Sequence, residues 1–578
     1  MNPIAKMHKG SALYRISVLS VMALLIGVSA SLAAIAFADS VIWLNNALLI
    51  SPRMRVQYAG SPYVVLAATL FAPIAGGIIV GLLLQKFTNA RRPLGPADVI
   101  VATQMRLPLP DARSGIVSTM AAALSIGFGA SVGQYGPMVY LGALIGSAAE
   151  KLKLRIRSIS AIAMACGVAA AISTAFNAPI AGLVFAHEVI LRHYSLQAFA
   201  PVTVASATGY VIANVMFDRP PLFLVEFPGV ANSHEFLLFA MLGVIAALIA
   251  KIYMRFLLRS AEIAKKLAIP QWVKPGLAGL AVGVTALWLP DVIGIGKEAL
   301  RFATIEGAFT PTELLVLVAA KIILTAVCLG FGFAGGVFSP ALLIGILSGA
   351  LFWNLLDGFQ LLENSGIVVY AVCGMMAVTS PVIGAPLTTI LIVFELTRNY
   401  DLTVAAMVAV VFSNLVSYRI FGRSLFDIQL AAKGVDLSTG RDHARLAAIS
   451  VAKFATTDFP AASPDEPAQA ALDRCPREQW NEIYVAGNNG DFHGIMYKSE
   501  RFNDPNALVA DVTRPATVIF DEETNVKQAM EKFIGFVGTA APLVASDGRL
   551  LGVVTEADIF RAYLDTVQEL RNEENASA

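Results

Sequence analysis

The chain has 578 residues, of which 56% are hydrophobic and 14% charged, and its mean hydropathy is +0.68. A chain this apolar is not a soluble protein, and it is too long for one domain, so we expect a polytopic protein in a lipid bilayer. The net charge of +1 gives no basic field, which excludes nucleic-acid binding. The four cysteines are widely scattered, so we predict neither a disulfide framework nor a metal site.

The N-terminal region predicts a cytoplasmic start followed by two membrane helices. Residues 16–38 form a long hydrophobic run and a second run follows at about 62–85, which favours a membrane helix over a cleaved signal peptide. The segments before the first run and after the second are basic, with Lys6, Lys9, Arg15, Lys86, Arg91 and Arg92. Positive charge favours the cytoplasmic face. We therefore place residues 1–15 in the cytoplasm and the chain in the plasma membrane, most simply of a bacterium.

Helical apolar segments continue to residue 421. They lie at about 115–130, 138–150, 159–172, 179–192, 198–216, 235–258, 274–290, 312–330, 340–356, 367–378, 386–397 and 403–421. Several are shorter than the roughly 20 residues that cross about 30 Å of hydrocarbon. We therefore expect tilted helices and helices broken half-way through the membrane.

Two glycine-rich stretches interrupt this pattern, GFAGGVFSP at 332–340 and GQYGP at 133–137. In both, the closing proline is followed by glycines five and nine residues later. A helix that starts inside a hydrophobic layer has unpaired backbone N–H groups, which must face protein, water or an ion. The ion that they favour is an anion.

A further matched pair of motifs indicates that the chain repeats itself at half-length. NAP at 177–179 leads to Glu188, and GAP at 384–386 leads to Glu395, with nine residues from proline to glutamate in both. Two such halves that converge through discontinuous helices are typical of transporters with a midplane site. We place the halves at about 16–220 and 235–435.

The sequence changes character after residue 422. Residues 436–448 form a polar linker, and residues 449–578 read as a soluble α/β region. This region has its own repeat, because GDFHGIMY at 490–497 matches GRLLGVVT at 548–555. We predict two copies of one small unit, at about 449–505 and 506–566. The predicted strands are 483–485, 541–544 and 551–554.

Together these motifs resemble the CLC family of chloride channels and proton-coupled anion exchangers over about residues 15–435. The resemblance lies in Gly336-x-Phe338-x-Pro340, in Gly133-x-x-Gly136-Pro137, and in FNAPIAG at 176–182. The C-terminal repeat resembles a pair of CBS motifs. The resemblance implies an all-α polytopic membrane domain (16–435), an inverted repeat of tilted and broken helices, followed by a cytosolic α/β CBS pair. It also implies a homodimer with one anion pathway per subunit and with both termini in the cytoplasm.

The sequence departs from the family's exchangers at both proton-carrying positions. The gating glutamate of Gly-Arg-Glu-Gly-Pro corresponds to Tyr135, and the arginine before it corresponds to Gln134. The inner proton-handling glutamate corresponds to Val189, the residue type of the family's channels. A phenol titrates near pH 10 and valine not at all, so both titrating groups are lost. The alternative is that Tyr135 only plugs the vestibule while another group, such as His187, carries coupling.

Two side-chain anion ligands of the family are also changed. Its Gly-Ser-Gly-Ile-Pro motif corresponds to RPLGP at 92–96, which puts Pro93 at the serine and Gly95 in the same loop. The tyrosine of the last membrane helix corresponds to Phe426. Proline at the serine position resembles family members that prefer nitrate. The ligand is therefore chloride or another small monovalent anion.

The loss of both hydroxyls leaves the central anion to the backbone. We expect N–H groups near Val337 and Phe338, with those near Gly136, to bind it. A neutral phenol can donate one hydrogen bond. We therefore hypothesise that the Tyr135 hydroxyl substitutes as a donor to the anion.

The intramembrane ionisable residues have structural and functional interpretations. Glu188 and Glu395 are functional candidates by position, but their symmetric placement favours two acids that cap backbone where the halves meet. His187 beside Glu188 can sense pH, although a satisfied structural pair is the simpler expectation. Lys251 and Lys321 are expected to extend toward the membrane surface.

In the C-terminal region, GVVTEAD at 552–558 resembles the part of a CBS motif that binds an adenine nucleotide. The resemblance puts Thr555 near phosphate and Asp558 on the ribose, whereas the first copy has Tyr497 and Glu500 at these positions. We expect one nucleotide site, or a purely structural, dimerising pair. A bound nucleotide would be the cofactor.

These observations predict a passive anion channel or uniporter, with a proton-coupled anion antiporter as the alternative. No nucleophile–base pair or metal-ligand cluster is recognisable, so we predict no enzymatic activity. A nucleotide sensor without ion flux is a third possibility.

Overall fold

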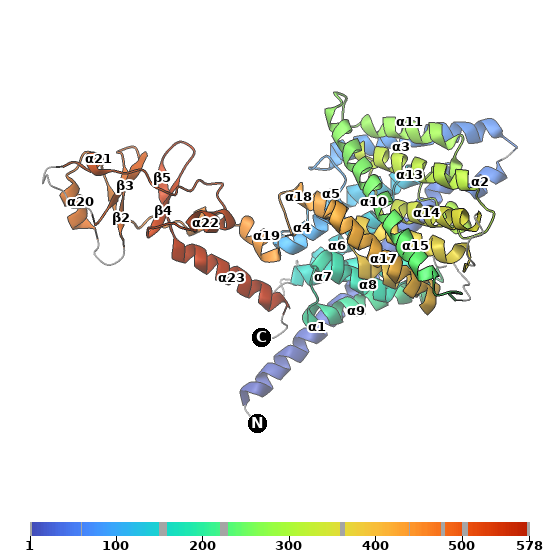
Figure 1. The fold of residues 1–578 in the computed structure, drawn as a ribbon, viewed down its shortest axis with the longest axis horizontal. Helices are drawn as coiled ribbons and strands as arrows, with labels where there is room; N and C mark the ends of the chain where they lie inside the picture. The colour runs from blue at the N-terminus through green and yellow to red at the C-terminus, as the bar shows by residue number, and fades with distance from the viewer. Residues whose placement is uncertain are drawn as a thin grey trace. The chain divides into compact units, whose positions relative to one another are not determined.

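The computed structural model describes residues 3–58, 60–149, 159–219, 229–358, 364–438, 440–475, 480–499 and 507–574. These residues form two compact units, Met1–Gly434 and Val435–Ala578, each of which is described by itself. The described residues of the first unit form helices joined by loops, and the second unit contains two small sheets and flanking helices (Figure 1). The predicted fold class is confirmed.

The helices of the first unit fall into two runs, one before and one after residues 217–234. The first run is α1 (Pro3–Ala47), α2 (Pro52–Gln57), α3 (Pro62–Phe87), α4 (Pro96–Met105), α5 (Ala112–Gly127), α6 (Tyr135–Ser147), α7 (Ile159–Phe176), α8 (Pro179–Phe185), the π-helix η2 (Ala186–Leu191), α9 (Leu196–Tyr210) and the π-helix η3 (Val211–Met216). The second run is α10 (Glu235–Lys266), α11 (Lys274–Ala286), the 3₁₀-helix η4 (Pro290–Val292), α12 (Lys297–Phe302), α13 (Pro311–Gly330), α14 (Phe338–Gly358), α15 (Ile367–Ile383), α16 (Pro386–Thr397), α17 (Tyr400–Phe421) and α18 (Leu425–Ala431).

Eight helices among the described residues are long and apolar enough to cross a membrane. Others are too short, as predicted: α8 has 7 residues and α16 has 12. The helix α1, by contrast, has 45 residues and exceeds the predicted 16–38. Proline at an interior position breaks a helix, and the chain has none between Pro3 and Pro52, so no proline interrupts α1.

The glycines that recur five and nine residues after each proline are explained by close helix packing. A Cβ on Gly142 of α6 would clash with the carbonyl of Gly167 in α7. In the other half, a Cβ on Gly345 of α14 would lie 2.5 Å from the carbonyl oxygen of Gly374 in α15. Small residues let helix backbones approach in membranes. The two half-helices α6 and α14 are therefore fixed by the same contact in both halves.

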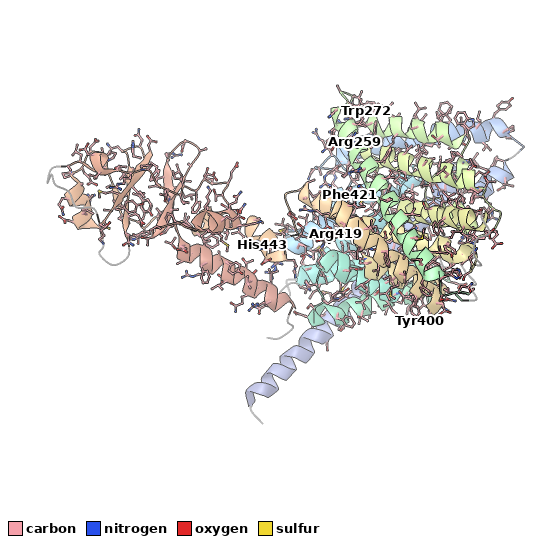
Figure 2. All side chains as sticks on the ribbon, in the orientation of Figure 1. Arg259, Trp272, Tyr400, Arg419, Phe421 and His443 are labelled. Carbon is pink, nitrogen blue, oxygen red and sulfur yellow. The ribbon has the colours of Figure 1, made fainter. Side chains whose placement is uncertain are left out.

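Exposed tyrosine and basic side chains lie near the two ends of α17. Tyr400 and Phe421 mark its two ends in Figure 2, and Tyr400 and Tyr418 are 73% and 74% exposed. Arg419 in the last turn is also exposed. Tyrosine and basic residues are favoured at membrane–water boundaries, so these side chains mark where α17 leaves the hydrocarbon.

The second unit contains two similar hairpins. Its elements are α19 (Arg441–Ala447), η5 (Val451–Phe454), β1 (Ala461–Ala462), α20 (Ala468–Arg474), β2 (Glu482–Ala486), β3 (Phe492–Tyr497), α21 (Val509–Val512), α22 (Val526–Phe533), β4 (Ala540–Val544), β5 (Leu550–Thr555) and α23 (Glu556–Glu574). The antiparallel pairs β2–β3 and β4–β5 each carry one irregularity at the same place in the register. The hairpin loops pair with each other through Phe492 and Gly548, and through Leu550 and Gly490. The predicted strands are confirmed, and the repeat of the sequence is a repeat of structure.

Candidate anion pathway

The two glycine-rich stretches meet in a two-residue β-bridge. The Gly133 N–H donates to the Gly336 carbonyl and the Gly336 N–H to the Gly133 carbonyl, both at 2.7 Å. A Cβ on Gly336 would lie 2.8 Å from the backbone nitrogen of Gly136, so only glycine permits this approach. The first residues of α6 and α14 are therefore held side by side. Both helix starts present N–H groups and the positive end of a helix dipole at the same place.

An aromatic cluster fills the space in front of these helix starts. The Tyr135 ring stacks on Phe176 with centroids 4.1 Å apart, and it meets Phe338 edge-on at 5.3 Å. Phe338 also contacts Phe176 and Phe185, at 5.4 and 6.5 Å. Tyr135 is 1% exposed, and its hydroxyl is hydrogen-bonded to the Gln134 side chain. The residue at the gate position is thus packed as an aromatic plug.

Three hydroxyl groups that the sequence did not single out support this junction. The Ser339 hydroxyl accepts from the Gln134 N–H at 3.3 Å, and the Ser125 hydroxyl accepts from the Ala334 N–H at 3.1 Å. The buried Tyr253 hydroxyl in α10 donates to the Val337 carbonyl at 3.3 Å. In a trans peptide the carbonyl and the next N–H point in opposite directions. The Tyr253 contact therefore turns the Phe338 N–H to the side opposite the Tyr253 hydroxyl.

Tyr253→Phe is predicted to weaken chloride binding about fivefold, because it removes one hydrogen bond of about 1 kcal/mol that orients the Phe338 N–H. Calorimetric titration of the purified protein with chloride measures this. Tyr370→Phe is the matched control, since it removes the buried hydrogen bond to Glu235, at 3.0 Å, without touching this junction. Equal chloride affinity in Tyr253→Phe and the native protein would contradict the prediction.

The start of α4 borders the same junction. A Cβ on Gly136 would lie 3.6 Å from the Cδ atom of Pro96, so α4 begins beside the start of α6. Gly95 is the N-cap residue of α4, and a Cβ built there meets nothing within 4 Å. Pro93 and Gly95 are half-buried, and Leu94 is held by its N–H to the Ser118 hydroxyl at 2.7 Å. The Cβ side of Gly95 is therefore not packed against another residue.

Phe426 lies in α18, which is tied to its neighbours by ion pairs at both ends. Asp427 pairs with Arg192 at the end of η2, at 2.7 Å, and Lys433 pairs with Asp98 of α4, at 2.6 Å. Arg92 also pairs with Asp98, at 2.7 Å. Burial alone would raise the pKa of Asp98, but the hydrogen bonds from Arg92 and Lys433 outweigh it and hold the pKa below its ordinary value. The buried Phe426 ring thus lies in a short helix that is fixed against α4.

Val189 lies in a π-helical turn and is 2% exposed. Gln104 of α4 donates to the carbonyls of Ile190 and Leu191, at 2.7 and 2.8 Å. These bonds satisfy carbonyls at the end of η2. Position 189 is therefore an ordered, apolar site next to α4.

The two intramembrane glutamates cap each other's helices. Glu188 accepts from the Leu387 and Thr388 N–H groups at the start of α16, at 2.9 and 2.8 Å, and from the Thr388 hydroxyl at 2.6 Å. Glu395 accepts from the Ile180 and Ala181 N–H groups at the start of α8, at 2.8 and 2.7 Å. Carboxylates are favoured at helix N-termini. The interpretation of these acids as caps between the halves is confirmed.

The comparison with protein families decides the identity of this helical unit. The family model described as voltage gated chloride channel matches residues 76–418, more than half of the chain. The chain belongs to the CLC family. Its C-terminal unit contains a CBS domain, because the CBS model matches residues 509–565, in the second predicted copy.

Curated relatives of this CLC chain are chloride channel proteins of bacteria. A ClcB-like chloride channel protein of Ralstonia nicotianae is 29% identical over 368 residues, which are 63% of this chain and 86% of that protein. The voltage-gated ClC-type chloride channel ClcB of Escherichia coli is 29% identical over 369 residues, 62% of this chain and 85% of that protein.

Solved structures show that the fold is that of the family. A slow cyanobacterial Cl⁻/H⁺ antiporter aligns with a TM-score of 0.64 at 21% identity, over 72% of this chain and 97% of that one. A eukaryotic CLC transporter aligns with a TM-score of 0.61 at 20% identity, over 94% and 98%. The predicted inverted repeat of broken helices is therefore the CLC fold.

Two expectations for charged and polar residues of the CLC unit are wrong. Lys321 does not extend to the surface: it is 1% exposed, and its ammonium donates to the Val292 and Gly294 carbonyls at 2.9 and 2.7 Å. The carbonyls of the loop after η4 are close enough to satisfy the ammonium inside the protein. His187 does not pair with Glu188; its Nδ1 contacts the Leu183 carbonyl at 3.0 Å and the ring stacks on Tyr194. Glu188 is already occupied by α16.

In the C-terminal unit, the two predicted nucleotide residues are hydrogen-bonded to each other. The Thr555 hydroxyl donates to Asp558 at 2.6 Å and accepts from the Asp558 N–H at 3.1 Å, at the start of α23. Their counterpart Tyr497 ends β3, whereas Glu500 lies outside the described residues. The contact leaves one carboxylate oxygen of Asp558 for another partner.

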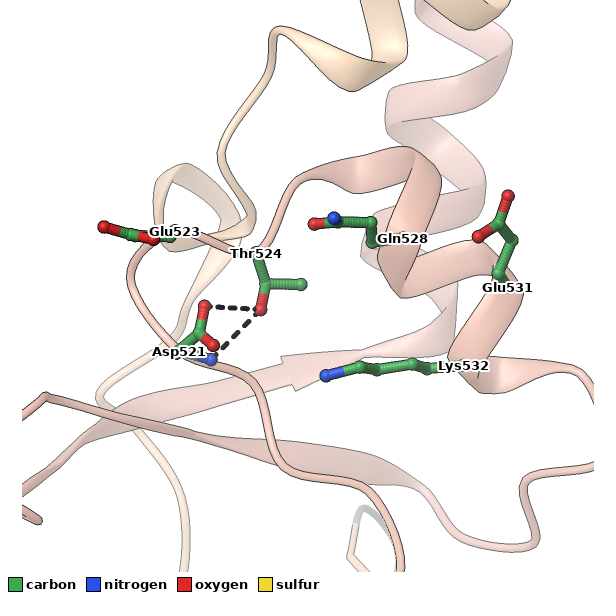
Figure 3. A pocket seen from close by; sticks show the side chains of 6 residues that line it. All are labelled: Asp521, Glu523, Thr524, Gln528, Glu531 and Lys532. Carbon is green, nitrogen blue, oxygen red and sulfur yellow. Dashed lines mark hydrogen bonds between the residues drawn. The ribbon is translucent and has the colours of Figure 1, made fainter.

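A surface pocket of about 460 Å³ lies elsewhere in this unit (Figure 3). Its lining residues are Asp521, Glu523, Thr524, Gln528, Glu531 and Lys532. The Thr524 hydroxyl bonds to Asp521 and holds the pKa of that carboxyl below its ordinary value. Three carboxylates against one ammonium repel phosphate, so this pocket does not fit the phosphates of a nucleotide.

Proposed function

We propose that this CLC protein conducts a small monovalent anion passively, as a channel or uniporter, without moving protons. The observation that carries the proposal is the chemistry at the two proton positions. Tyr135 and Val189 are 1% and 2% exposed, and neither bears a carboxylate. A proton-coupled exchanger needs groups that gain and lose protons near neutral pH, and a buried phenol among aromatic rings is no such group.

Three features support binding of an anion at the junction of α4, α6 and α14. Two helix starts are joined by the Gly133–Gly336 bridge, the Phe338 N–H is oriented through Tyr253, and the space beside Gly95 is open. The ligands would be backbone N–H groups near Val337, Phe338 and Gly136. Backbone N–H groups distinguish poorly between chloride and nitrate, because they recognise the negative charge of an anion more than its shape.

The alternative is proton-coupled anion antiport, the activity after which the structurally similar cyanobacterial antiporter is named. In this chain the residue that would have to carry protons is His187, whose Nε2 atom is buried with no hydrogen-bond partner among the described residues. Reconstituted protein distinguishes the two modes: passive conduction gives anion flux with no proton movement, and antiport gives proton uptake against its gradient.

The cellular arrangement is also a proposal. The cytosolic CBS unit follows α18, and the basic residues Arg92 and Lys433 lie on the same side of the first unit as α18. Positive residues favour the cytoplasmic face, which puts both termini in the cytoplasm and the protein in the plasma membrane. We propose a homodimer with one pathway in each subunit; mass measurement in detergent tests it.

For the CBS unit we propose one adenine-nucleotide site at Thr555 and Asp558. Calorimetric titration with ATP and AMP tests it. Nucleotide present at 100 times its dissociation constant should stabilise the native protein by about 2.7 kcal/mol, and Asp558→Ala should abolish this stabilisation. The same melting midpoint with and without nucleotide in the native protein would favour a purely structural CBS pair.

A further inference from the structure

The half-helix α6 carries a second tyrosine, Tyr140, on the side that faces α4. Tyr140 lies four residues after Gly136, so the two residues share one face of the helix. A Cβ on Gly136 would lie 3.6 Å from the Cδ atom of Pro96, which places this face against the start of α4. Side chains on a helix lean toward its N-terminus. The Tyr140 ring therefore extends back along α6 toward the α4 start.

Contacts with α5 fix the position of the Tyr140 ring. A Cβ built on Gly115 of α5 would lie 2.9 Å from Cε1 of this ring and 3.3 Å from its hydroxyl oxygen, so the contact requires a glycine. Ser118, three residues later on the same face of α5, accepts from the Leu94 N–H at 2.7 Å. The Tyr140 hydroxyl thus lies about one turn of α5 from the 93–95 loop that leads into α4.

The Tyr140 hydroxyl is buried and has no hydrogen-bond partner among the described residues. The whole side chain is only 1% exposed. Buried polar groups in proteins are nearly always hydrogen-bonded, and an exception commonly marks a bound water or ion. The unpartnered hydroxyl therefore indicates an acceptor that does not belong to the described part of the chain.

The backbone of the 93–95 loop has no donor to spare for such a ligand. Both N–H groups of this loop are already engaged, that of Gly95 by the Asp98 carboxylate at 3.0 Å. Pro93 has no N–H and stands where the family has a serine. A ligand beside this loop needs a donor from another element, and a phenol has one hydrogen to donate.

The charges at the α4 start favour an anion as the missing acceptor. The Asp98 carboxylate is bound by Arg92 at 2.7 Å and by Lys433 at 2.6 Å. These two positive groups and one negative group carry a net charge of +1, and the positive end of the α4 dipole adds to it. A cation is disfavoured in this field, and a cation does not accept the hydrogen of a phenol.

We propose that the Tyr140 hydroxyl donates a hydrogen bond to a small monovalent anion beside the α4 start, in place of the hydroxyls that Pro93 and Phe426 lack. Tyr140 is then a specificity-determining residue of the pathway. The proposal rests on anion transport as the function of this chain. Because Gly115 fixes the ring, the hydroxyl is already in place before the anion arrives.

The test is Tyr140→Phe in the full-length protein, which removes the hydroxyl and keeps the ring against Gly115. Calorimetric titration with chloride should show binding weakened about fivefold to tenfold, the effect of one lost hydrogen bond to a charged group. Half-saturating chloride for uptake into proteoliposomes should rise by the same factor, while uptake at saturating chloride and the melting midpoint without chloride stay native.

Tyr370→Phe is the matched control, because it removes the hydroxyl of another buried tyrosine, one whose partner Glu235 lies within the protein at 3.0 Å. Its chloride affinity should equal that of the native protein. An equal loss of affinity in Tyr140→Phe and in this control would overturn the proposal, because any buried phenol would then have the same effect.

Native chloride affinity in Tyr140→Phe, with a native melting midpoint, would also overturn the proposal and would assign a water molecule to the hydroxyl. Proton movement in vesicles of the native protein would instead overturn passive conduction, and the effect of Tyr140→Phe on chloride binding would still stand. The two failures are therefore distinguishable.

Discussion

Replacing Tyr135 by alanine should raise passive chloride flux about tenfold per reconstituted protein. The Tyr135 ring must leave its contacts with Phe176 and Phe338 for an anion to pass. Each aromatic pair contributes roughly 0.5–1.5 kcal/mol, so removing both lowers the barrier by about 1–3 kcal/mol. A barrier lower by 1.4 kcal/mol is about tenfold in rate. Chloride efflux from proteoliposomes with a potassium shunt measures the change.

The Tyr135→Phe variant distinguishes the steric role of the Tyr135 ring from the proposed role of its hydroxyl as a donor to the anion. It keeps the ring contacts and removes the donor, so the flux should stay near the native value while the ratio of chloride to nitrate flux changes. Identical selectivity in Tyr135→Phe would remove the hydroxyl from the anion site. Flux in Tyr135→Ala that equals or falls below the native flux would contradict the plug itself.

Glu188→Ala should lower the free energy of unfolding by about 2–3 kcal/mol. The substitution leaves two N–H groups at the start of α16 and the Thr388 hydroxyl without their acceptor. Hydrogen bonds to a charged group contribute about 1.5–3 kcal/mol each when buried, and the half-buried position of Glu188 reduces the sum. Thermal unfolding in detergent shows the loss as a lower melting midpoint.

Glu395→Ala should lower the midpoint to a similar extent, because Glu395 binds the start of α8 in the same way. The exposed Glu262 of α10 is the control, and Glu262→Ala should change stability by no more than about 0.5 kcal/mol. Ion selectivity should be unchanged in both cap variants. Native melting midpoints with altered selectivity would mean that these acids act in transport and not as caps.

The sequence predicted those parts of the molecule in which local chemistry repeats. The glycines after Pro137 and Pro340 predicted that the two stretches repeat each other, and the equal spacing from Pro179 to Glu188 and from Pro386 to Glu395 predicted two acids that cap backbone where the halves meet. In each case both members of the pair are short motifs with a fixed backbone requirement. The hairpins β2–β3 and β4–β5 were also predicted from a short motif that occurs twice.

The sequence did not predict contacts between residues far apart that follow no repeat. Tyr253 looked like any aromatic residue of an apolar helix, and only the fold places its hydroxyl on the Val337 carbonyl. From the sequence, Lys321 was expected to reach the membrane surface. In the fold its ammonium instead binds the carbonyls of Val292 and Gly294, which are distant in the sequence. The hydrogen-bond partner of a long polar side chain depends on tertiary packing. The spacing of residues along the sequence does not predict that packing.

The most direct test of passive conduction is anion efflux from proteoliposomes in which valinomycin sets the membrane voltage and external pH is recorded. The account predicts that chloride leaves only when the potassium shunt is open and that external pH stays constant. Proton movement driven uphill by the chloride gradient would contradict it. Coupling would then have survived without a carboxylate at Tyr135 or Val189.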